Sequence, residues 1–146
     1  MPRTALSRKD IDAFREQLCA VAARRFAEQG FAILATSGTA AYLRDHGVPV
    51  AQVVAKVGEG DGEVPDAVRL IGDGDVQLVV NTPRGRGPRA DGAYIRTAAS
   101  VSKVPCLTTA AAARAAASGM ADWARHPLRV RSLQEFHADD QLQLPL

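Results

Sequence analysis

Short apolar runs that alternate with helical segments are the feature that most limits how this chain can fold. The runs lie at Phe31–Ala35, Val50–Val54, Val76–Val80 and Val104–Leu107. Helices are expected around them, over 11–29, 39–46, 64–71, 91–103 and 110–118. Because nearly continuous apolar strands are buried on both faces, they belong to parallel sheets covered by helices. The sequence therefore predicts a three-layer α/β/α fold around a mainly parallel sheet of roughly five strands.

The length of 146 residues fits a single domain. We expect residues 1–138 to form it, with a last short helix capped by Ser132 and ending near His137, and residues 139–146 to fray. A net charge of +2 is too small to indicate nucleic-acid binding. The sequence contains neither an apolar run of membrane-spanning length nor a signal peptide. Cys19 and Cys106 lack metal-ligand spacing and indicate a reducing compartment, so a cytoplasmic location is expected.

Ligands of parallel α/β sheets bind beyond the carboxyl ends of the strands, and the first candidate site lies there. Thr36, Ser37, Gly38 and Thr39 follow the first apolar run and open the next helix. A helix start offers free N–H groups and a positive dipole end, which together favour a phosphate. The alternative is that these residues only cap the helix. Lys56 follows the next extended run and is a candidate partner for the same phosphate, or else a solvated lysine.

A second group of polar residues follows the later strands. Asn81 and Thr82 are candidates for contact with a base or ribose, although a local Asx turn explains them equally well. Arg84, Arg86 and Arg89 make the next loop basic. None of the three histidines has the spacing of a metal site or a catalytic triad. We therefore expect no catalytic residue, no metal and no cofactor.

Several of these stretches, in this order, resemble the methylglyoxal-synthase-like domain at the carboxyl end of the carbamoyl-phosphate synthase large subunit. The likeness covers about residues 10 to 138 and is specific, because several unlike motifs agree in order. Its matching stretches are Gln29–Ala40, Leu43–Pro49, Lys56–Gly60, Val79–Pro83, Gly87–Arg96, Val104–Thr109 and Val130–Glu135.

The resemblance implies an allosteric, non-catalytic domain of an ATP-dependent, glutamine-hydrolysing ligase that serves pyrimidine and arginine biosynthesis. Its effector would be UMP, IMP or a similar nucleotide, or ornithine, and its partners would be the synthetase domains of the large subunit. The resemblance gives the phosphate to Thr36, Thr39 and Lys56, and the ribose or base to Asn81 and Thr82. It also places Thr108 and Thr109 near the effector. The choice of effector, the sign of its effect and self-association stay open, a homo-oligomer included.

Three other functions compete with this hypothesis. Methylglyoxal synthase, an enzyme of the same fold, needs a carboxylate base and a positioned acid. Here Asp61 is displaced by about a residue from that family's position, and Arg89 stands where a histidine is expected. The cyclohydrolase domain of purine synthesis shares the hydroxyl-rich loop, but the lysine- and histidine-bearing motif that follows it is missing. The third alternative is an interaction module that binds no ligand.

Overall fold

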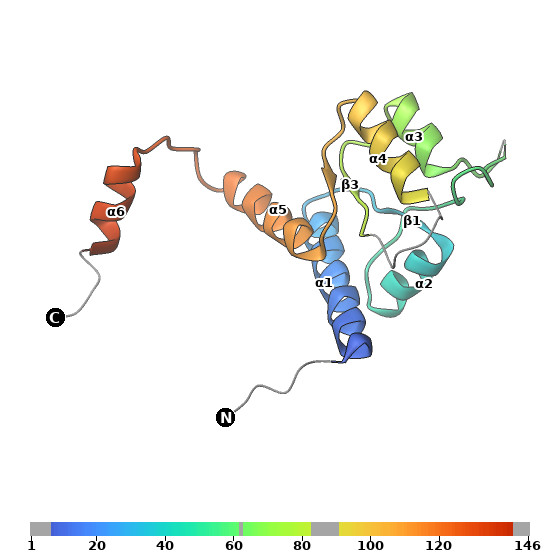
Figure 1. Cartoon of the computed structure of the whole chain (residues 1–146), viewed down its shortest axis with the longest axis horizontal. Helices are drawn as coiled ribbons and strands as arrows, with labels where there is room; N and C mark the ends of the chain where they lie inside the picture. Colours follow the sequence, from blue (N-terminus) through green and yellow to red (C-terminus); the bar gives the residue numbers. More distant parts are fainter. Residues whose placement is uncertain (1–6, 62, 83–90, 142–146) are drawn as a thin grey trace.

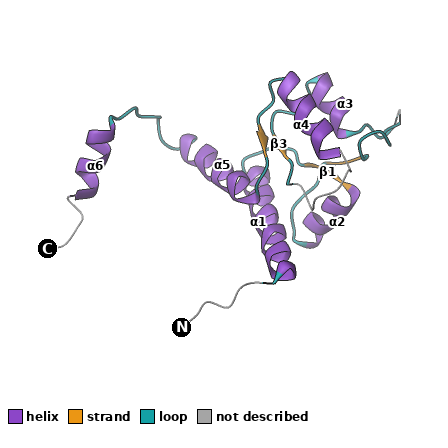
Figure 2. Ribbon diagram, in the orientation of Figure 1, coloured by secondary structure: helices purple, strands orange, loops and turns teal. Residues whose placement is uncertain are grey.

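The computed structural model describes residues 7–61, 63–82 and 91–141. Helices and strands alternate along the chain as the sequence predicts (Figures 1 and 2). The strands are β1 (Leu34–Thr36), β2 (Gln52–Val54), β3 (Val79–Val80) and β4 (Cys106–Leu107). The helices are α1 (Arg8–Glu28), α2 (Ser37–Asp45), α3 (Ala67–Asp73), α4 (Asp91–Val101), α5 (Ala110–Trp123) and α6 (Leu133–Gln141).

The strands form two parallel pairs, and here the expectation of one sheet of about five strands is corrected. β1 pairs with β2, with Thr36 opposite Val54, and β3 pairs with β4, with Val80 opposite Leu107. Among the described residues the two pairs remain separate two-stranded sheets. The parallel direction is as predicted. Within the part of the chain that the structure describes, β1 and β3 share no hydrogen bonds, and each ladder is only two or three residues long, so the two pairs do not merge into one sheet.

Helix α1 begins earlier than the sequence pattern indicates, because a capping box fixes its first turn. Ser7 Oγ accepts a hydrogen bond from Asp10 N at 3.2 Å, while the Asp10 carboxylate accepts one from Ser7 N at 3.1 Å. Together these bonds satisfy two N–H groups at the helix start. The helix ends at Glu28, and Gly30 has a φ of 89°, the left-handed conformation expected beyond a helix end.

Helices cover both faces of the β3–β4 pair. Successive side chains of a strand point to opposite faces, so neighbouring residues of β3 contact different helices. Val79 packs in a cluster with Ile71 and Ala99, from α3 and α4. Its neighbour Leu78 packs against a second cluster, formed by residues of α1 and α5. The members of that second cluster are Ala22, Phe26, Ala113 and Ala117. The pairs α1–α5 and α3–α4 thus form two helical layers, and small alanines let the first pair approach closely (Figure 1).

The C-terminal part is more helical than expected. Helix α5 continues to Trp123, past the predicted end at Ser118. Helix α6 runs to Gln141, past the predicted end near His137, and residues 142–146 lie outside the described residues. Ser132 caps α6 as predicted, accepting a hydrogen bond from Glu135 N at 3.2 Å. Figure 1 shows α6 standing apart from the other helices. None of the described helices combines the length and apolarity needed to cross a bilayer.

Candidate functional site

One large cavity, of about 1360 Å³, lies among the strands and helices and reaches the carboxyl ends of β1, β2 and β3. It brings together most of the residues that the sequence singled out. Its lining includes Thr36, Ser37, Gly38, Thr39, Lys56, Asn81 and Thr82. Hydroxyl, amide and ammonium groups from three loops that are distant in sequence therefore border one space.

At the start of α2, no capping side chain among the described residues occupies the backbone N–H groups. Thr36 is the N-cap residue, yet its side chain makes no capping hydrogen bond, and its Oγ1 lies 3.5 Å from Thr39 Oγ1. By contrast, a side chain of the N-cap residue caps α1, α3, α5 and α6. The predicted alternative, that the Thr36 side chain caps the helix, is not what the geometry shows. Uncapped N–H groups at a helix start suit an anion.

Gly38 adds room at the same helix start. A methyl group built on Gly38 would meet no atom within 4 Å, so the space beside it is open. Ser37 and Thr39, on either side of it, are both exposed. The first turn of α2 thus presents two hydroxyl groups and an open backbone to the cavity.

Lys56 reaches this edge through the register of β1 and β2. Thr36 lies opposite Val54, so Lys56 follows its strand at the same end as the Thr36–Thr39 segment. The side chain is exposed and makes no ion pair with the residues that the structure describes. An ammonium group at the same sheet edge as the start of α2, unpaired by the residues described, makes this edge electropositive.

Asn81 has a structural task that the sequence did not reveal. Its side-chain Nδ2 donates a hydrogen bond to the carbonyl oxygen of Gly92, at 2.9 Å. This bond joins the end of β3 to the first turn of α4, so Asn81 is more than the local turn that sequence reasoning left open. Thr82, half-buried, follows it on the cavity wall. The basic residues Arg84, Arg86 and Arg89 fall outside the described residues.

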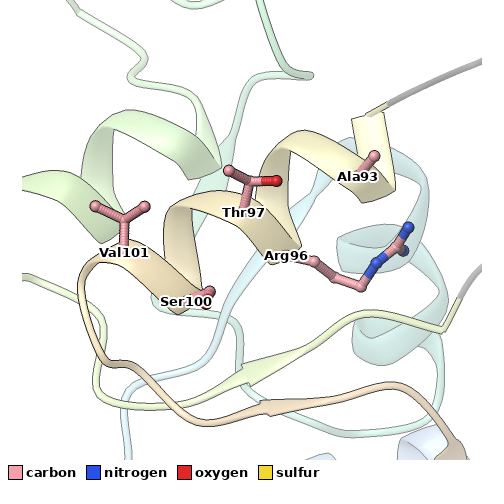
Figure 3. A pocket seen from close by; sticks show the side chains of 5 residues that line it. All are labelled: Ala93, Arg96, Thr97, Ser100 and Val101. Carbon is pink, nitrogen blue, oxygen red and sulfur yellow. The ribbon is translucent and has the colours of Figure 1, made fainter.

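Two further residues of the cavity wall, Gly92 and Arg96, were missed as site residues. A methyl group on Gly92 would come within 3.2 Å of both Arg96 Nη1 and Asn81 Nδ2, so the lack of a side chain leaves room for both groups. Figure 3 shows the Arg96 side chain extending toward the start of α4, near Ala93. Burial raises the pKa of the Cys106 thiol, and the positive charge of Arg96 partly offsets this rise. The sequence could have indicated both residues, because Gly92 and Arg96 belong to the stretch Gly87–Arg96 that resembles the family.

The structure does not bring Thr108 and Thr109 to the cavity wall. Thr109 Oγ1 accepts a hydrogen bond from Ala112 N at 3.1 Å and caps α5. Thr108 is exposed. A hydroxyl side chain that precedes a helix can serve as a cap or as a ligand contact, and here Thr109 serves as a cap.

Asp61 is used within its own loop. Its Oδ1 accepts hydrogen bonds from Glu63 N at 2.9 Å and Val64 N at 2.6 Å, and these bonds lower the pKa of the carboxyl group. Asp66 closes the other end of the loop by accepting from Gly58 N, at 3.0 Å. The described residues contain no cluster of His, Cys, Asp or Glu that could hold a metal ion.

Parallel strands that end in hydroxyl and amide groups, beside an uncapped helix start, define an α/β domain suited to binding a small anion. The chain belongs to the MGS-like domain family, whose model matches residues 19–108. It is 51% identical over 117 residues to the carbamoyl phosphate synthase large chain of Rubrobacter xylanophilus. It is 50% identical over 119 residues to that of Streptomyces avermitilis, and 43% identical over 120 residues to that of Mycobacterium tuberculosis.

These matches cover 80%, 80% and 78% of this chain, but only 11%, 11% and 10% of the respective relatives. The chain thus spans about a tenth of the length of the curated relatives that it matches. The predicted resemblance is confirmed at the level of the family and of these relatives.

Proposed function

We propose that this chain is the effector-binding regulatory domain of a carbamoyl-phosphate synthase and that it binds a nucleoside monophosphate such as UMP or IMP. The observation that carries the proposal is the start of α2, where the N-cap side chain makes no capping bond, with Lys56 at the same edge and in no ion pair with the described residues. A phosphate placed there would accept hydrogen bonds from the first N–H groups of α2 and from the hydroxyl groups of Thr36, Ser37 and Thr39. Lys56 would neutralise part of its charge.

The remainder of the nucleotide would lie along the wall formed by Asn81, Thr82 and Arg96. Asn81 Nδ2 already donates to Gly92, so its Oδ1 and the Thr82 hydroxyl are the groups left for a ribose or base. Arg96 supplies a second cation on the cavity wall, in addition to Lys56. A second cation in the lining favours a ligand larger than inorganic phosphate alone.

The regulated reaction would be the ATP-dependent synthesis of carbamoyl phosphate by the synthetase domains of a longer protein. An effector changes that reaction only if it binds two arrangements of the domain with different affinity. The walls of the cavity come from two separate strand pairs, so a bound effector would favour an arrangement in which these walls lie closer together. Closing the walls on a ligand would shift the contact of this domain with its synthetase partner.

Calorimetric titration of the 146-residue chain with UMP, IMP, ornithine and inorganic phosphate tests the proposal. We expect a nucleotide to bind most tightly, and Lys56→Gln to weaken that binding by about tenfold to a hundredfold, as the loss of a charge-assisted hydrogen bond does. Lys9→Gln is the matched control, since Lys9 is exposed on α1 and lies outside the cavity wall. The proposal is wrong if no nucleotide binds, or if Lys56→Gln and Lys9→Gln have the same effect.

A further inference from the structure

The turn that carries Lys56 is held by hydrogen bonds on both sides of this residue. We call residues 55–59 the Lys56 turn. Before Lys56, Ala55 N donates a hydrogen bond to the carbonyl oxygen of Pro65 at 3.1 Å. After it, Glu59 N donates to the carbonyl oxygen of Lys56 itself at 2.9 Å and closes the turn. The backbone around Lys56 is therefore tied to the segment that precedes α3.

Asp66 joins the same turn through its side chain. Gly58 N donates a hydrogen bond to Asp66 Oδ2 at 3.0 Å, and the backbone of Asp66 forms a parallel bridge with Ala55. Gly58 has a φ of 79°, a left-handed conformation that glycine adopts without strain. The carboxylate thus connects the Lys56 turn to the start of α3 across eight residues of sequence.

The bond from Gly58 is not needed to cap α3. The capping bond is the one that Asp66 Oδ1 accepts from Arg69 N at 2.9 Å. One oxygen is enough for a cap, and Ser7 caps α1 with its single hydroxyl group. An aspartate adds a second acceptor, which is used here on Gly58. The two carboxylate oxygens thus have separate tasks, one in the helix and one in the Lys56 turn.

The chain also passes close to the backbone of Asp66 just after the turn. A Cβ atom built on Gly60 would lie 2.8 Å from Asp66 N and 3.3 Å from the carbonyl oxygen of Val64. Both are backbone atoms, so rotating a side chain would not relieve the contact. A glycine at position 60 thus lets the loop lie directly against Asp66.

We propose that Asp66 is a positioning residue for the phosphate site: it fixes the Lys56 turn, so that Lys56 is held at the edge of the sheet before a ligand binds. This inference rests on the proposed function, in which Lys56 pairs with the phosphate. Val54, Lys56 and Ala67 line the cavity, whereas Asp66 does not, so Asp66 acts only through Lys56. A site that is ordered in advance loses less conformational entropy on binding, which raises its affinity.

Asp66→Asn in the full 146-residue chain tests this role without a ligand. Asparagine caps helices as well as aspartate does, but its Nδ2 cannot accept the hydrogen bond from Gly58 N. We expect the amides of Gly58 and Glu59 to exchange at least about threefold faster in the variant, as measured by NMR. The amide of Asn81, which is bonded to β4, is the internal reference and should not change.

Calorimetry with UMP and IMP gives the second readout. Asp66→Asn should weaken binding by about threefold to tenfold, in line with one lost hydrogen bond. In a Lys56→Gln background the same change should cost less than about twofold, because a residue that acts through Lys56 has no effect once that charge is gone. A general loss of stability would cost the same in both backgrounds. Ser7→Ala, which removes the cap of α1 outside the cavity wall, should leave the affinity unchanged.

A second variant keeps the Asp66 side chain intact. Gly60→Ala would push the loop away from the Asp66 backbone and should weaken nucleotide binding by at least about threefold. Gly72→Ala is the matched control, since a methyl group there would meet no atom within 4 Å.

The positioning role is overturned if Asp66→Asn leaves the Gly58 and Glu59 amides or the affinity unchanged, or if it costs the same affinity with and without Lys56. It is also overturned if Gly60→Ala and Gly72→Ala bind the nucleotide equally well. These results would leave the proposed function standing. If neither nucleotide binds the unmodified chain, the proposed function fails, and the positioning role of Asp66 fails with it.

Discussion

The side-chain amide of Asn81 donates a hydrogen bond to the carbonyl oxygen of Gly92, 2.9 Å away, and so joins the end of β3 to the beginning of α4. The bond is half-buried and spans 11 residues of sequence. A Cβ atom at Gly92 would lie 3.2 Å from Arg96 Nη1 and from Asn81 Nδ2, so a glycine at this position leaves room for both groups. The wall of the proposed nucleotide site thus depends on a contact that is structural in itself.

Replacing Asn81 should affect both stability and ligand binding. Asn81→Ala leaves the Gly92 carbonyl without its partner, and we expect a loss of about 1 to 2 kcal/mol in the free energy of unfolding. Urea denaturation measures this loss, and calorimetry with the nucleotide measures the effect on binding. Thr97→Ala, on the outer face of α4 (Figure 3), is the control and should change neither quantity appreciably. Unchanged stability in Asn81→Ala would show that the bond to Gly92 contributes little.

The two threonines that precede α2 and α5 should separate binding from capping. Thr109→Ala removes a capping hydrogen bond of 3.1 Å, so we expect it to lower stability by about 1 kcal/mol and to leave nucleotide affinity unchanged. Thr36→Ala removes no capping bond, so it should cost less than about 0.5 kcal/mol but weaken nucleotide binding. Thermal unfolding with and without nucleotide measures both effects. The site described above would be contradicted if Thr109→Ala weakened nucleotide binding while Thr36→Ala lowered only the stability.

The sequence predicted the order and type of the elements well, because the evidence for them is local. Apolar runs and glycines near helix ends, such as Gly30, mark each element within a few residues. The separation of the two strand pairs could not be predicted, since strand partners depend on contacts between distant segments. The site shows the same division: the Thr36–Thr39 segment is visible as a pattern, but the bond from Asn81 to Gly92 exists only after folding.

Tight packing between α1 and α5 gives a prediction with a control on the same helix. Ala117 is completely buried against α1, so Ala117→Leu would overfill the contact and should lower stability by about 1 to 3 kcal/mol. Ala115, two residues earlier, is exposed, and Ala115→Leu should change stability by less than about 0.5 kcal/mol. The urea midpoint of each variant measures the difference. Equal midpoints would mean that the two helices pack less closely than described.

Asp66 should make the stability of this domain depend on pH in the acid range. Its carboxylate accepts hydrogen bonds from Arg69 N at 2.9 Å and from Gly58 N at 3.0 Å, and these bonds lower its pKa. A lowered pKa means that the folded state favours the charged form, so the contribution is complete above the unfolded value of about 3.9 and is lost as the pH falls through the folded pKa.

We therefore expect Asp66→Ala to destabilise the domain by about 1 kcal/mol at neutral pH, the usual cost of losing an N-cap. The difference from the unmodified chain should shrink steadily once the pH falls below about 4, because the protonated carboxyl no longer accepts these bonds well. Urea unfolding at a series of pH values measures it. Asp73→Ala, which removes only an exposed ion pair with Arg69 at 3.6 Å, should cost less than about 0.5 kcal/mol at neutral pH. A difference between Asp66→Ala and the unmodified chain that stayed constant down to the lowest pH would show that the carboxylate charge does not stabilise the fold.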